Sequence, residues 1–489
     1  KSFNCIVFID YDIIILGGIK MSKIQRENWG SRIGFIMAAA GSAVGLGNIW
    51  RFPYMAGSNG GGAFIMIYMF FSLVIGISIM IAEFAIGRRT SLGSVGAYKS
   101  INIRWTFAGV LGVLSSFFIM GFYPVVGGWS IAYIFKSATG LLSSSVAIKD
   151  IFDNFVSNPI EPLIWIIIFL GINAAIVAKG ITAGIEKASK ILMPMLFILL
   201  VLISIRSITL PGSEEGLSFL FEPDFTSLKQ ETYLAALGQS FFSLSLGMGC
   251  MITYGSYLNK NENLPTNALI ITLIGAGVAI LAGLAIFPAL FAFGMEPEGG
   301  PGLVFVVVPL IFKAMGRLGV IFAIIFFISL TVAALTSSVS LLEVVVAYFI
   351  DQRGMDRKKA VYISFFSMFI TSTLSSLSLG VMSETTFLGV GAFDFFDILT
   401  DKIFLSIGGL LLAIFCGWFV KKEDLKDELT NGGTIKFRLF ELWYNLVKFV
   451  IPVAIAFVAV MGIISIEQTG LMLFGVTIVV LLAIFSRKL

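Results

Sequence analysis

The sequence contains no histidine and little charge of either sign. Its 489 residues include 33 Lys and Arg and 29 Asp and Glu, and this 13% charged fraction is roughly half of what a soluble protein carries. The lack of histidine excludes a Ser-His-Asp triad, a HExxH zinc site and a histidine proton relay. The three cysteines, Cys5, Cys250 and Cys416, lie far apart, so they indicate neither a disulfide framework nor a metal cluster.

Hydrophobic residues are abundant instead and make up 57% of the chain. They recur in runs of about 18–25 residues, each long enough to cross a bilayer. The sequence therefore predicts an all-α polytopic membrane protein with about 12 transmembrane helices. The net charge of +4 does not indicate a nucleic-acid partner, because Lys and Arg are spread over short loops. The expected spans are 32–57, 62–87, 105–139, 161–179, 189–209, 232–258, 267–292, 318–349, 359–379, 395–420, 441–465 and 470–486.

The basic residues favour one side of these spans. They are dense near residues 23–32, 88–104, 179–190, 353–359 and 421–438, whereas the loops on the other side are richer in acid. Cytoplasmic loops carry the excess of Lys and Arg in membrane proteins. We therefore expect both termini to be cytoplasmic.

Residues 1–20 differ from the rest of the chain. They begin with Lys1, and Asp10 and Asp12 interrupt their apolar run. They lack the basic region and the small-residue cleavage site of a signal peptide. The codons for Leu16 to Met21 could include a bacterial ribosome-binding site. We expect translation to start at Met21 and residues 1–20 to be a non-native leader read from upstream sequence.

Two glycine-rich segments interrupt expected spans one and six. The first, residues 41–47, reads GSAVGLG, and the second, residues 243–249, reads SLSLGMG. Small residues can simply allow helices to pack closely. These segments, however, lie five spans apart, which makes them run in opposite directions, and Asn48 and Arg51 follow the first. Such a pair indicates an inverted-repeat transporter with helices broken at mid-membrane, where free carbonyls bind cations and helix N-termini bind carboxylates.

These segments belong to longer motifs. Residues 29–53 and 59–64 resemble the first-helix signature of the neurotransmitter:sodium symporter family, and residues 238–249 with Tyr254 and Tyr257 resemble its sixth helix. Residues 333–338 resemble its eighth helix. The resemblance, to the bacterial amino-acid transporter branch, implies sodium-coupled uptake of an amino acid by alternating access. It also implies a five-plus-five inverted repeat in residues 21–420, with broken helices one and six, followed by a cytoplasmic loop and two peripheral helices in residues 421–489.

The resemblance implies one or two bound sodium ions and no organic cofactor. A first sodium site would use the Ala43 carbonyl, the side chains of Asn48 and Ser243, and the carboxylate of the substrate. The ligands implied for a second sodium site are the carbonyls of Gly41, Val44 and Ala333 and the hydroxyls of Thr336 and Ser337.

The resemblance also implies where an amino acid binds. Its carboxylate would meet the backbone around Gly45 and the Tyr123 hydroxyl, and its amine would face carbonyl oxygens. Met248 stands where well-studied relatives have phenylalanine, so we expect a hydrophobic, aromatic substrate rather than glycine or γ-aminobutyrate. The implied substrate-binding residues are Ser42, Ala43, Gly45, Ile119, Tyr123, Val126, Phe242, Ser243, Ser245, Met248, Ser337 and Leu341.

Gates are implied on both sides of the pocket. At the outer side, Arg51 would pair with Asp397, with Asp394 as the alternative. At the inner side, Arg26 would pair with Asp351, helped by Trp29 and Tyr257. Two carboxylates inside expected spans also need partners. Glu83 matches a family residue that braces helix six. For Glu343 we expect only that some polar group is its partner.

One position departs from the family pattern. The Asn or Asp ligand that relatives carry in span seven corresponds here to Gly275, and the Ser or acidic residue one turn later corresponds to Ala279. Neither residue has a side-chain oxygen. We therefore expect a weakened first sodium site, sodium dependence close to first order, and no chloride requirement, unless water or Thr272 supplies the missing ligand.

Three other functions compete with a sodium symporter of the bacterial cytoplasmic membrane. A proton-coupled amino-acid carrier of the same architecture is disfavoured because the oxygens of the second sodium site are complete. A channel would need a continuous polar pore rather than one polar cluster at mid-membrane. An intramembrane enzyme is weakest, because the sequence shows no nucleophile–base pair.

Overall fold

The computed structural model describes residues 15–16, 19–20, 27–295 and 303–489. Within the expected leader, β1 (Ile15–Leu16) pairs in antiparallel fashion with β2 (Ile19–Lys20). The other residues of that leader, together with Met21 and Arg26, lie outside the described residues. The remainder of the described chain is helical.

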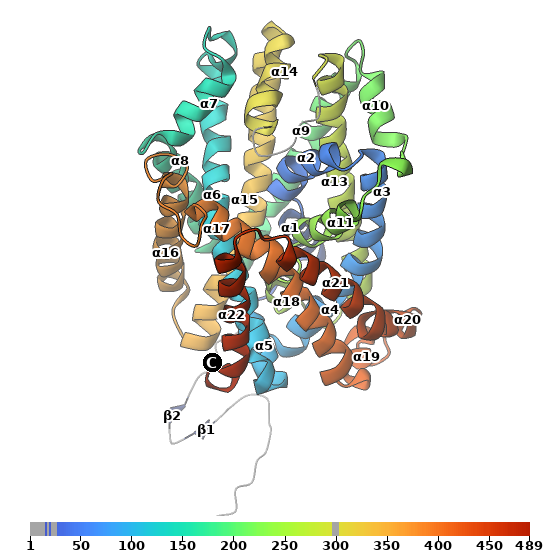
Figure 1. Cartoon of the computed structure of the whole chain (residues 1–489). Coiled ribbons are helices and arrows are strands. Elements are labelled where there is room, and N and C mark those ends of the chain that lie inside the picture. The colour runs from blue at the N-terminus through green and yellow to red at the C-terminus, as the bar shows by residue number, and fades with distance from the viewer. Residues whose placement is uncertain (1–14, 17–18, 21–26, 296–302) are drawn as a thin grey trace, which may run out of the picture.

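Long helices lie side by side and form one bundle (Figure 1). The first half of the chain contains α1 (Arg32–Ala43), α2 (Phe52–Ser58), α3 (Gly62–Phe71), α4 (Ile77–Thr90), α5 (Ser94–Ile101), α6 (Thr106–Ala138), α7 (Ile148–Ser157), α8 (Glu161–Val177), α9 (Lys187–Ile208) and α10 (Glu214–Phe221). Single π-helical turns join several of them, at Gly47–Arg51, Ser72–Gly76 and Ile181–Glu186.

The second half repeats the pattern of a broken helix followed by longer ones. It contains α11 (Gln230–Ser243), α12 (Cys250–Gly255), α13 (Leu264–Ala292), α14 (Val308–Ala314), α15 (Arg317–Arg353), α16 (Arg357–Leu377), α17 (Ala392–Ile398), α18 (Leu405–Ile414), α19 (Lys422–Thr430), α20 (Phe440–Asn445), α21 (Ile451–Ile464) and α22 (Thr469–Ile484). Further π-helical turns lie at Leu303–Val307, Leu399–Phe404, Phe415–Phe419 and Leu446–Val450, and short 3-10 turns at Ile103–Trp105, Leu141–Ser143, Phe225–Ser227 and Ser486–Lys488.

By length and composition, eight helical segments of the described residues can cross a membrane, or ten when each of two bent pairs counts as one span. The bent pairs are α1 with the helix Gly47–Ser58, at 45°, and α7 with α8, at 76°. The two other predicted spans are the broken pair α11 and α12 and the 16-residue helix α22. The predicted class, an all-α polytopic membrane protein, is confirmed.

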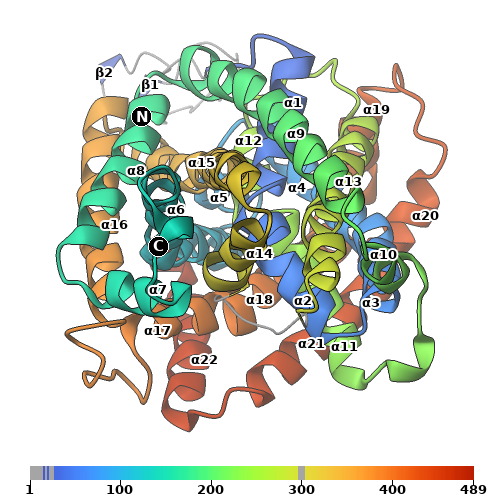
Figure 2. The same cartoon turned by 90° about the horizontal axis from the view of Figure 1, so that it is seen from above.

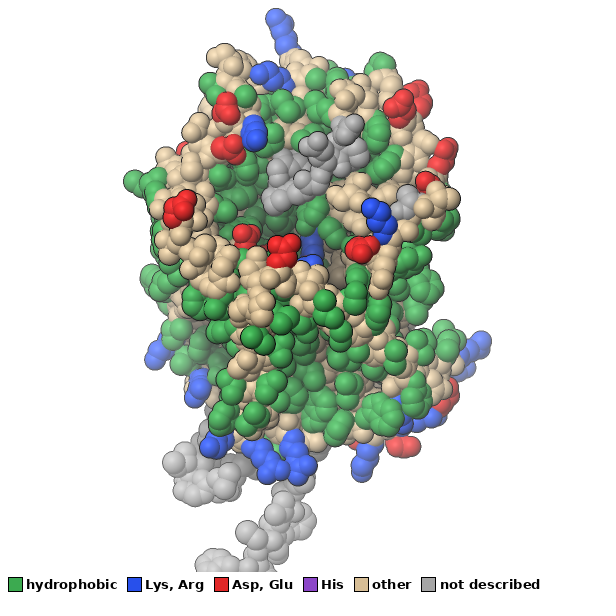
Figure 3. All heavy atoms as spheres, in the orientation of Figure 1, with side chains coloured by type: hydrophobic (Ala, Val, Ile, Leu, Met, Phe, Trp, Pro, Cys, Tyr) green, Lys and Arg blue, Asp and Glu red, His purple; other side chains and the backbone are tan. Residues whose placement is uncertain are grey.

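The interior and the surface of the bundle differ in composition. Viewed from above, α6 and α15 lie toward the middle, and α8, α9, α13 and α16 lie outside them (Figure 2). Helix α6 packs against α15, and α13 packs against α9. A broad hydrophobic band crosses the face of the molecule seen in Figure 3, and Lys and Arg side chains gather at the lower end, where α5 and α19 lie. This is the end that the sequence predicts to be cytoplasmic.

Candidate functional site

The first expected break separates α1 from α2. Helix α1 begins where the Ser31 hydroxyl accepts a hydrogen bond from the Gly34 amide at 3.0 Å, and it ends at Ala43. Val44 is not helical (φ −112°, ψ 83°), so carbonyl groups at this end of α1 are free to bind other partners. A side chain at Gly45 would collide with the Ser337 hydroxyl and the Tyr123 hydroxyl. Glycine here therefore allows side chains of α6 and α15 to approach the unwound backbone.

The second break separates α11 from α12. Gly247 and Gly249 both have left-handed φ angles, +76° and +77°, which glycine adopts without strain. The Gly247 amide donates to Glu83 Oε1 of α4 at 2.8 Å. The structure thus places Glu83 against the unwound part of span six, where the sequence predicted a bracing carboxylate.

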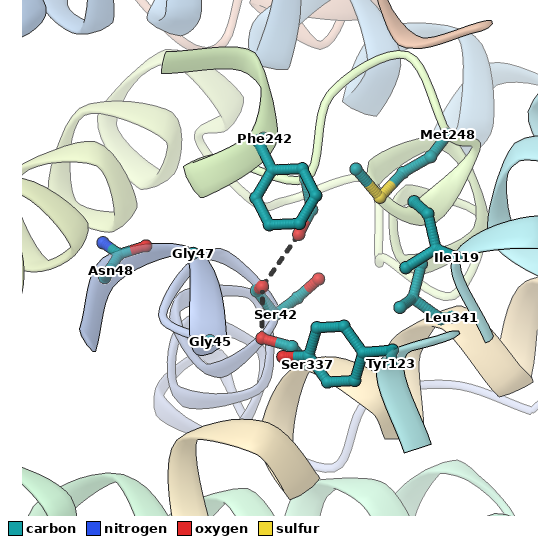
Figure 4. A pocket seen from close by; sticks show the side chains of 11 residues that line it. Ser42, Gly45, Gly47, Asn48, Ile119, Tyr123, Phe242, Met248, Ser337 and Leu341 are labelled. Carbon is teal, nitrogen blue, oxygen red and sulfur yellow. Dashed lines mark hydrogen bonds between the residues drawn. The ribbon is translucent and has the colours of Figure 1, made fainter. Parts of the chain in front are cut away.

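Hydroxyl groups connect the two breaks. The Ser42 carbonyl oxygen accepts from Ser245 Oγ at 2.7 Å and from Ser337 Oγ at 2.9 Å (Figure 4). Ser245 itself has φ +54°, a conformation that is costly outside glycine, and its side-chain bond holds it there. The unwound residues of spans one and six thus meet each other and α15 at one point in the bundle.

The ligands implied for the second sodium site lie together. Thr336 Oγ1 lies 3.4 Å from the Val44 carbonyl oxygen and 3.0 Å from that of Ala333. Ser337 Oγ lies 3.1 Å from the Gly41 carbonyl oxygen. All five are neutral, hard oxygen atoms, which suits a sodium ion. Their arrangement fits the ion chemically.

The residues implied for the first sodium site are less complete. The Asn48 amide nitrogen donates to the Gly275 carbonyl at 2.9 Å, and among the described residues its Oδ1 atom has no hydrogen-bond partner although it is buried. Ser243 Oγ instead lies 2.9 Å from the Tyr68 hydroxyl. A methyl group built on Gly275 would lie 4.0 Å from the Ala43 carbonyl oxygen, so a side chain there could reach this site.

A cavity lies between the two breaks (Figure 4). Asn48 and Gly47 lie at one end of it, and Met248, Ile119 and Leu341 lie at the other. Tyr123 contributes its hydroxyl, which accepts from the Leu46 amide at 3.0 Å. Three of the predicted substrate-binding residues, Ala43, Val126 and Ser243, do not line this cavity. The residues that line it are Ser42, Gly45, Gly47, Asn48, Ile119, Tyr123, Phe242, Ser245, Met248, Ser337 and Leu341.

The structure corrects the predicted partner of Arg51, the residue of the predicted outer gate. Its Nη2 atom lies 2.7 Å from Asp401 Oδ1, one helical turn beyond Asp397 and two beyond Asp394. Three aspartates at spacings of three and four share one side of a helix, so spacing alone could not distinguish them. Arg51 and Asp401 border a second cavity of about 260 Å³.

Arg26 of the predicted inner gate lies outside the described residues, so its pairing with Asp351 stays a prediction. Asp351 Oδ2 accepts from the Gly93 amide at 2.7 Å. The Trp29 indole donates to the Tyr254 carbonyl at 3.0 Å, and the Trp29 amide donates to the Tyr257 carbonyl at 3.2 Å. The two predicted aromatic residues therefore lie together beneath the cavity.

Sequence reasoning missed Arg357, which begins α16. Its Nη1 atom lies 2.8 Å from Oε2 of the buried Glu343, and its Nε atom lies 3.1 Å from Glu27 Oε1. Tyr257 donates to Glu343 Oε1 at 2.6 Å. The signal was the carboxylate of Glu343 inside an apolar span, which required a partner. Arg357, just past the turn that follows α15, is this partner.

Comparison with known proteins identifies the family. The profile described as the sodium:neurotransmitter symporter family matches residues 26–159 and 147–480. The chain is 40% identical over 451 residues to YhdH, an uncharacterized sodium-dependent transporter of Bacillus subtilis (strain 168), covering 91% of this chain and 100% of that one. It is 41% identical over 446 residues to an uncharacterized sodium-dependent transporter of Haemophilus influenzae, covering 88% and 97%.

A solved structure agrees with these relatives. The crystal structure of MhsT in complex with L-phenylalanine superposes with a TM-score of 0.83 at 46% identity, covering 89% of this chain and 100% of that one. The family consists of membrane transporters rather than enzymes, and the expected sodium dependence agrees with the names of the relatives. The chain belongs to the sodium:neurotransmitter symporter family.

Proposed function

We propose that this protein imports a hydrophobic, aromatic amino acid together with sodium across the bacterial cytoplasmic membrane by alternating access. The observation that carries the proposal is the cavity between the two helix breaks. Its Asn48 end offers unwound backbone and an unpartnered amide oxygen, and its other end offers Ile119, Leu341 and Met248. A hydrophobic amino acid matches this arrangement, because it is charged at its backbone end and apolar at its side chain.

The backbone at Gly45 and the Tyr123 hydroxyl bind the substrate carboxylate in this proposal. The absence of a side chain at Gly45 lets the Tyr123 hydroxyl lie against the backbone at the break. The amide groups after the break lie where the partial positive charge of a helix N-terminus favours an anion. The amine then faces carbonyl oxygens of Ala43, Phe242 and Ser245. Both charged groups of the amino acid thereby receive partners without any charged protein side chain.

Met248 supports a large apolar substrate. It lies at the apolar end of the cavity and follows Gly247 in the unwound part of span six. A thioether side chain is flexible, adapts its shape and makes favourable contacts with aromatic rings. The structure of the similar protein MhsT, whose ligand is L-phenylalanine, also supports this substrate class.

One sodium ion bound by Gly41, Val44, Ala333, Thr336 and Ser337 drives uptake in this proposal. The site around Asn48 lacks a side-chain ligand from span seven, because Gly275 stands there. A cation with fewer oxygen ligands is bound more weakly. Transport therefore depends mainly on the second site, with no chloride requirement.

We further propose that residues 21–420 form the transporting core, with helices one to five and six to ten as inverted repeats, and that both termini are cytoplasmic. The opposed breaks at Val44 and at residues 244–249 support the repeat. The Lys and Arg side chains at one end of the bundle support the orientation.

Binding to the purified protein tests the substrate class. Labelled phenylalanine is bound in sodium and in potassium buffer, and tyrosine, tryptophan, leucine, glycine and γ-aminobutyrate compete for it. We expect sodium-dependent binding that the aromatic residues and leucine displace and that glycine and γ-aminobutyrate do not. Displacement by glycine in preference to all aromatic residues would contradict the proposed substrate.

A further inference from the structure

A group of polar side chains adjoins the cavity at Ser42. We call Ser42, Ser116, Cys250 and Ser340 the polar cluster; they come from four separate segments and are all buried. Ser116 Oγ donates to the Met248 carbonyl at 2.7 Å, and Ser340 Oγ lies 3.7 Å from Cys250 Sγ. Apolar substrates alone would not require hydroxyl groups at this place.

Ser42 is the member of the cluster that lines the cavity. Figure 4 shows it between the Asn48 end and the apolar end formed by Leu341 and Ile119. Its Oγ atom lies 2.7 Å from Ser340 Oγ, and Ser340 Oγ lies 2.7 Å from the Ser337 carbonyl oxygen. The side chain of Ser42 thus has a fixed partner on the side away from the cavity.

The hydrogen atoms of these two hydroxyls can be counted. Each serine has one proton and two acceptor lone pairs. When Ser340 donates to the Ser337 carbonyl, Ser42 donates to Ser340 and retains both of its lone pairs. When Ser340 donates to Ser42 instead, Ser42 retains one lone pair and its own proton. In both arrangements of these two hydroxyls Ser42 Oγ keeps at least one acceptor lone pair, and Ser42 lines the cavity.

We infer that Ser42 selects aromatic substrates whose ring carries a hydrogen-bond donor. The phenol of tyrosine and the indole of tryptophan can donate to Ser42 Oγ, whereas the ring of phenylalanine cannot. This inference rests on the proposed function, because it concerns the same cavity. A single neutral hydrogen bond corresponds to about fivefold tighter binding. Phenylalanine is still accepted, since Ser42 keeps its bond to Ser340.

Equilibrium binding to the purified full-length protein in sodium buffer tests this selection. Tyrosine and 4-fluorophenylalanine each compete with labelled phenylalanine for binding. 4-Fluorophenylalanine has a substituent at the same ring position as the tyrosine hydroxyl, but this substituent cannot donate a hydrogen bond. We expect tyrosine to bind about fivefold more tightly than 4-fluorophenylalanine in the wild type, and the ratio to fall to about one in Ser42→Ala. Ser116→Ala is the matched control, because its hydroxyl donates to the Met248 carbonyl; it should keep the wild-type ratio.

The outcomes distinguish this inference from the proposed function. Equal affinities for tyrosine and 4-fluorophenylalanine in the wild type would overturn the inference without any variant having to fold. A wild-type ratio that persists in Ser42→Ala would also overturn it. In both cases sodium-dependent binding of phenylalanine would leave the proposed function standing. If no labelled phenylalanine is bound in sodium, the proposed function fails, and the inference fails with it.

Discussion

Arg51 of the first span and Asp401 of the tenth span form an ion pair of 2.7 Å. Their side chains are only 11% and 16% exposed, and the guanidinium also lies 4.8 Å from the centre of the Phe242 ring. Phe242 in turn lines the cavity between the helix breaks. The pair therefore lies directly outside the proposed substrate site, where a gate must open and close.

We predict that this pair, and not one with Asp397, is needed for transport. Removing one partner of a poorly hydrated ion pair leaves the other charge uncompensated, which costs about 3–5 kcal/mol. Arg51→Ala should abolish uptake, and Asp401→Asn should lower the initial rate by at least about tenfold. Asp397→Asn is the control on the same helix and should do less. Greater damage from Asp397→Asn would show that the gate pairs differently during transport.

The second sodium site makes a prediction about affinity. Thr336 and Ser337 supply its two hydroxyl oxygens, so Thr336→Val and Ser337→Ala each remove one ligand. We expect the sodium concentration for half-maximal binding to rise about tenfold in each variant. Ser338→Ala is the control, because the Ser338 hydroxyl donates to Asn173 at 2.6 Å, away from the proposed site. An unchanged sodium affinity in both site variants would exclude this location for the ion.

The glycine at position 275 leads us to predict how many sodium ions drive uptake. We expect initial uptake to depend on sodium with a Hill slope near one, and the slope to steepen in Gly275→Asn, which restores an oxygen near Asn48 and Ala43. Gly277→Asn is the control for the same change on the same helix, since no atom lies within 4 Å of a methyl group built there. A wild-type slope near two would show that both sites are occupied without a side-chain oxygen at position 275.

Ala279 of α13 leads us to predict that uptake does not depend on chloride. Ala279 stands where relatives carry a serine or an acidic residue, and it cannot donate a hydrogen bond to an anion. Uptake should be unchanged when gluconate replaces chloride on both sides of the membrane. A loss of uptake in gluconate that chloride restores would show that other groups hold the anion.

Arg357 makes a prediction about stability. Arg357→Gln leaves Glu343 buried without its cation, which costs about 3–5 kcal/mol, so the unfolding temperature of the detergent-solubilised protein should fall. The double variant Arg357→Gln/Glu343→Gln should recover most of the loss, because no unpaired charge remains. Lys359→Gln, an exposed change on the same helix, is the control. A double variant as unstable as the single one would contradict this coupling.

The sequence was informative where local chemistry determines structure. Glycines in apolar spans predicted both breaks, because glycine adopts the left-handed backbone of Gly247 without strain and permits the close approach at Gly45. The hydroxyls of Thr336 and Ser337 also lie where the motif implied. In each case a single residue type was required at one position.

Side-chain partners across helices were harder to predict. Asp394, Asp397 and Asp401 follow one another along span ten, and Asp401 lies within the π-helical turn Leu399–Phe404, which shifts the register of the helix. The partner of Glu343 depends on the turn between α15 and α16, which brings Arg357 back toward it. Such contacts depend on how helices pack, which spacing within one helix does not determine.

Uptake by the purified protein in liposomes tests the central claim most directly. Labelled tyrosine and phenylalanine are supplied outside the liposomes, with an inward sodium gradient, an inward proton gradient or neither. The account predicts accumulation above the outside concentration only with the sodium gradient, and its loss in Thr336→Val at low sodium. Accumulation driven by the proton gradient in the absence of sodium would contradict the account and favour a proton-coupled carrier.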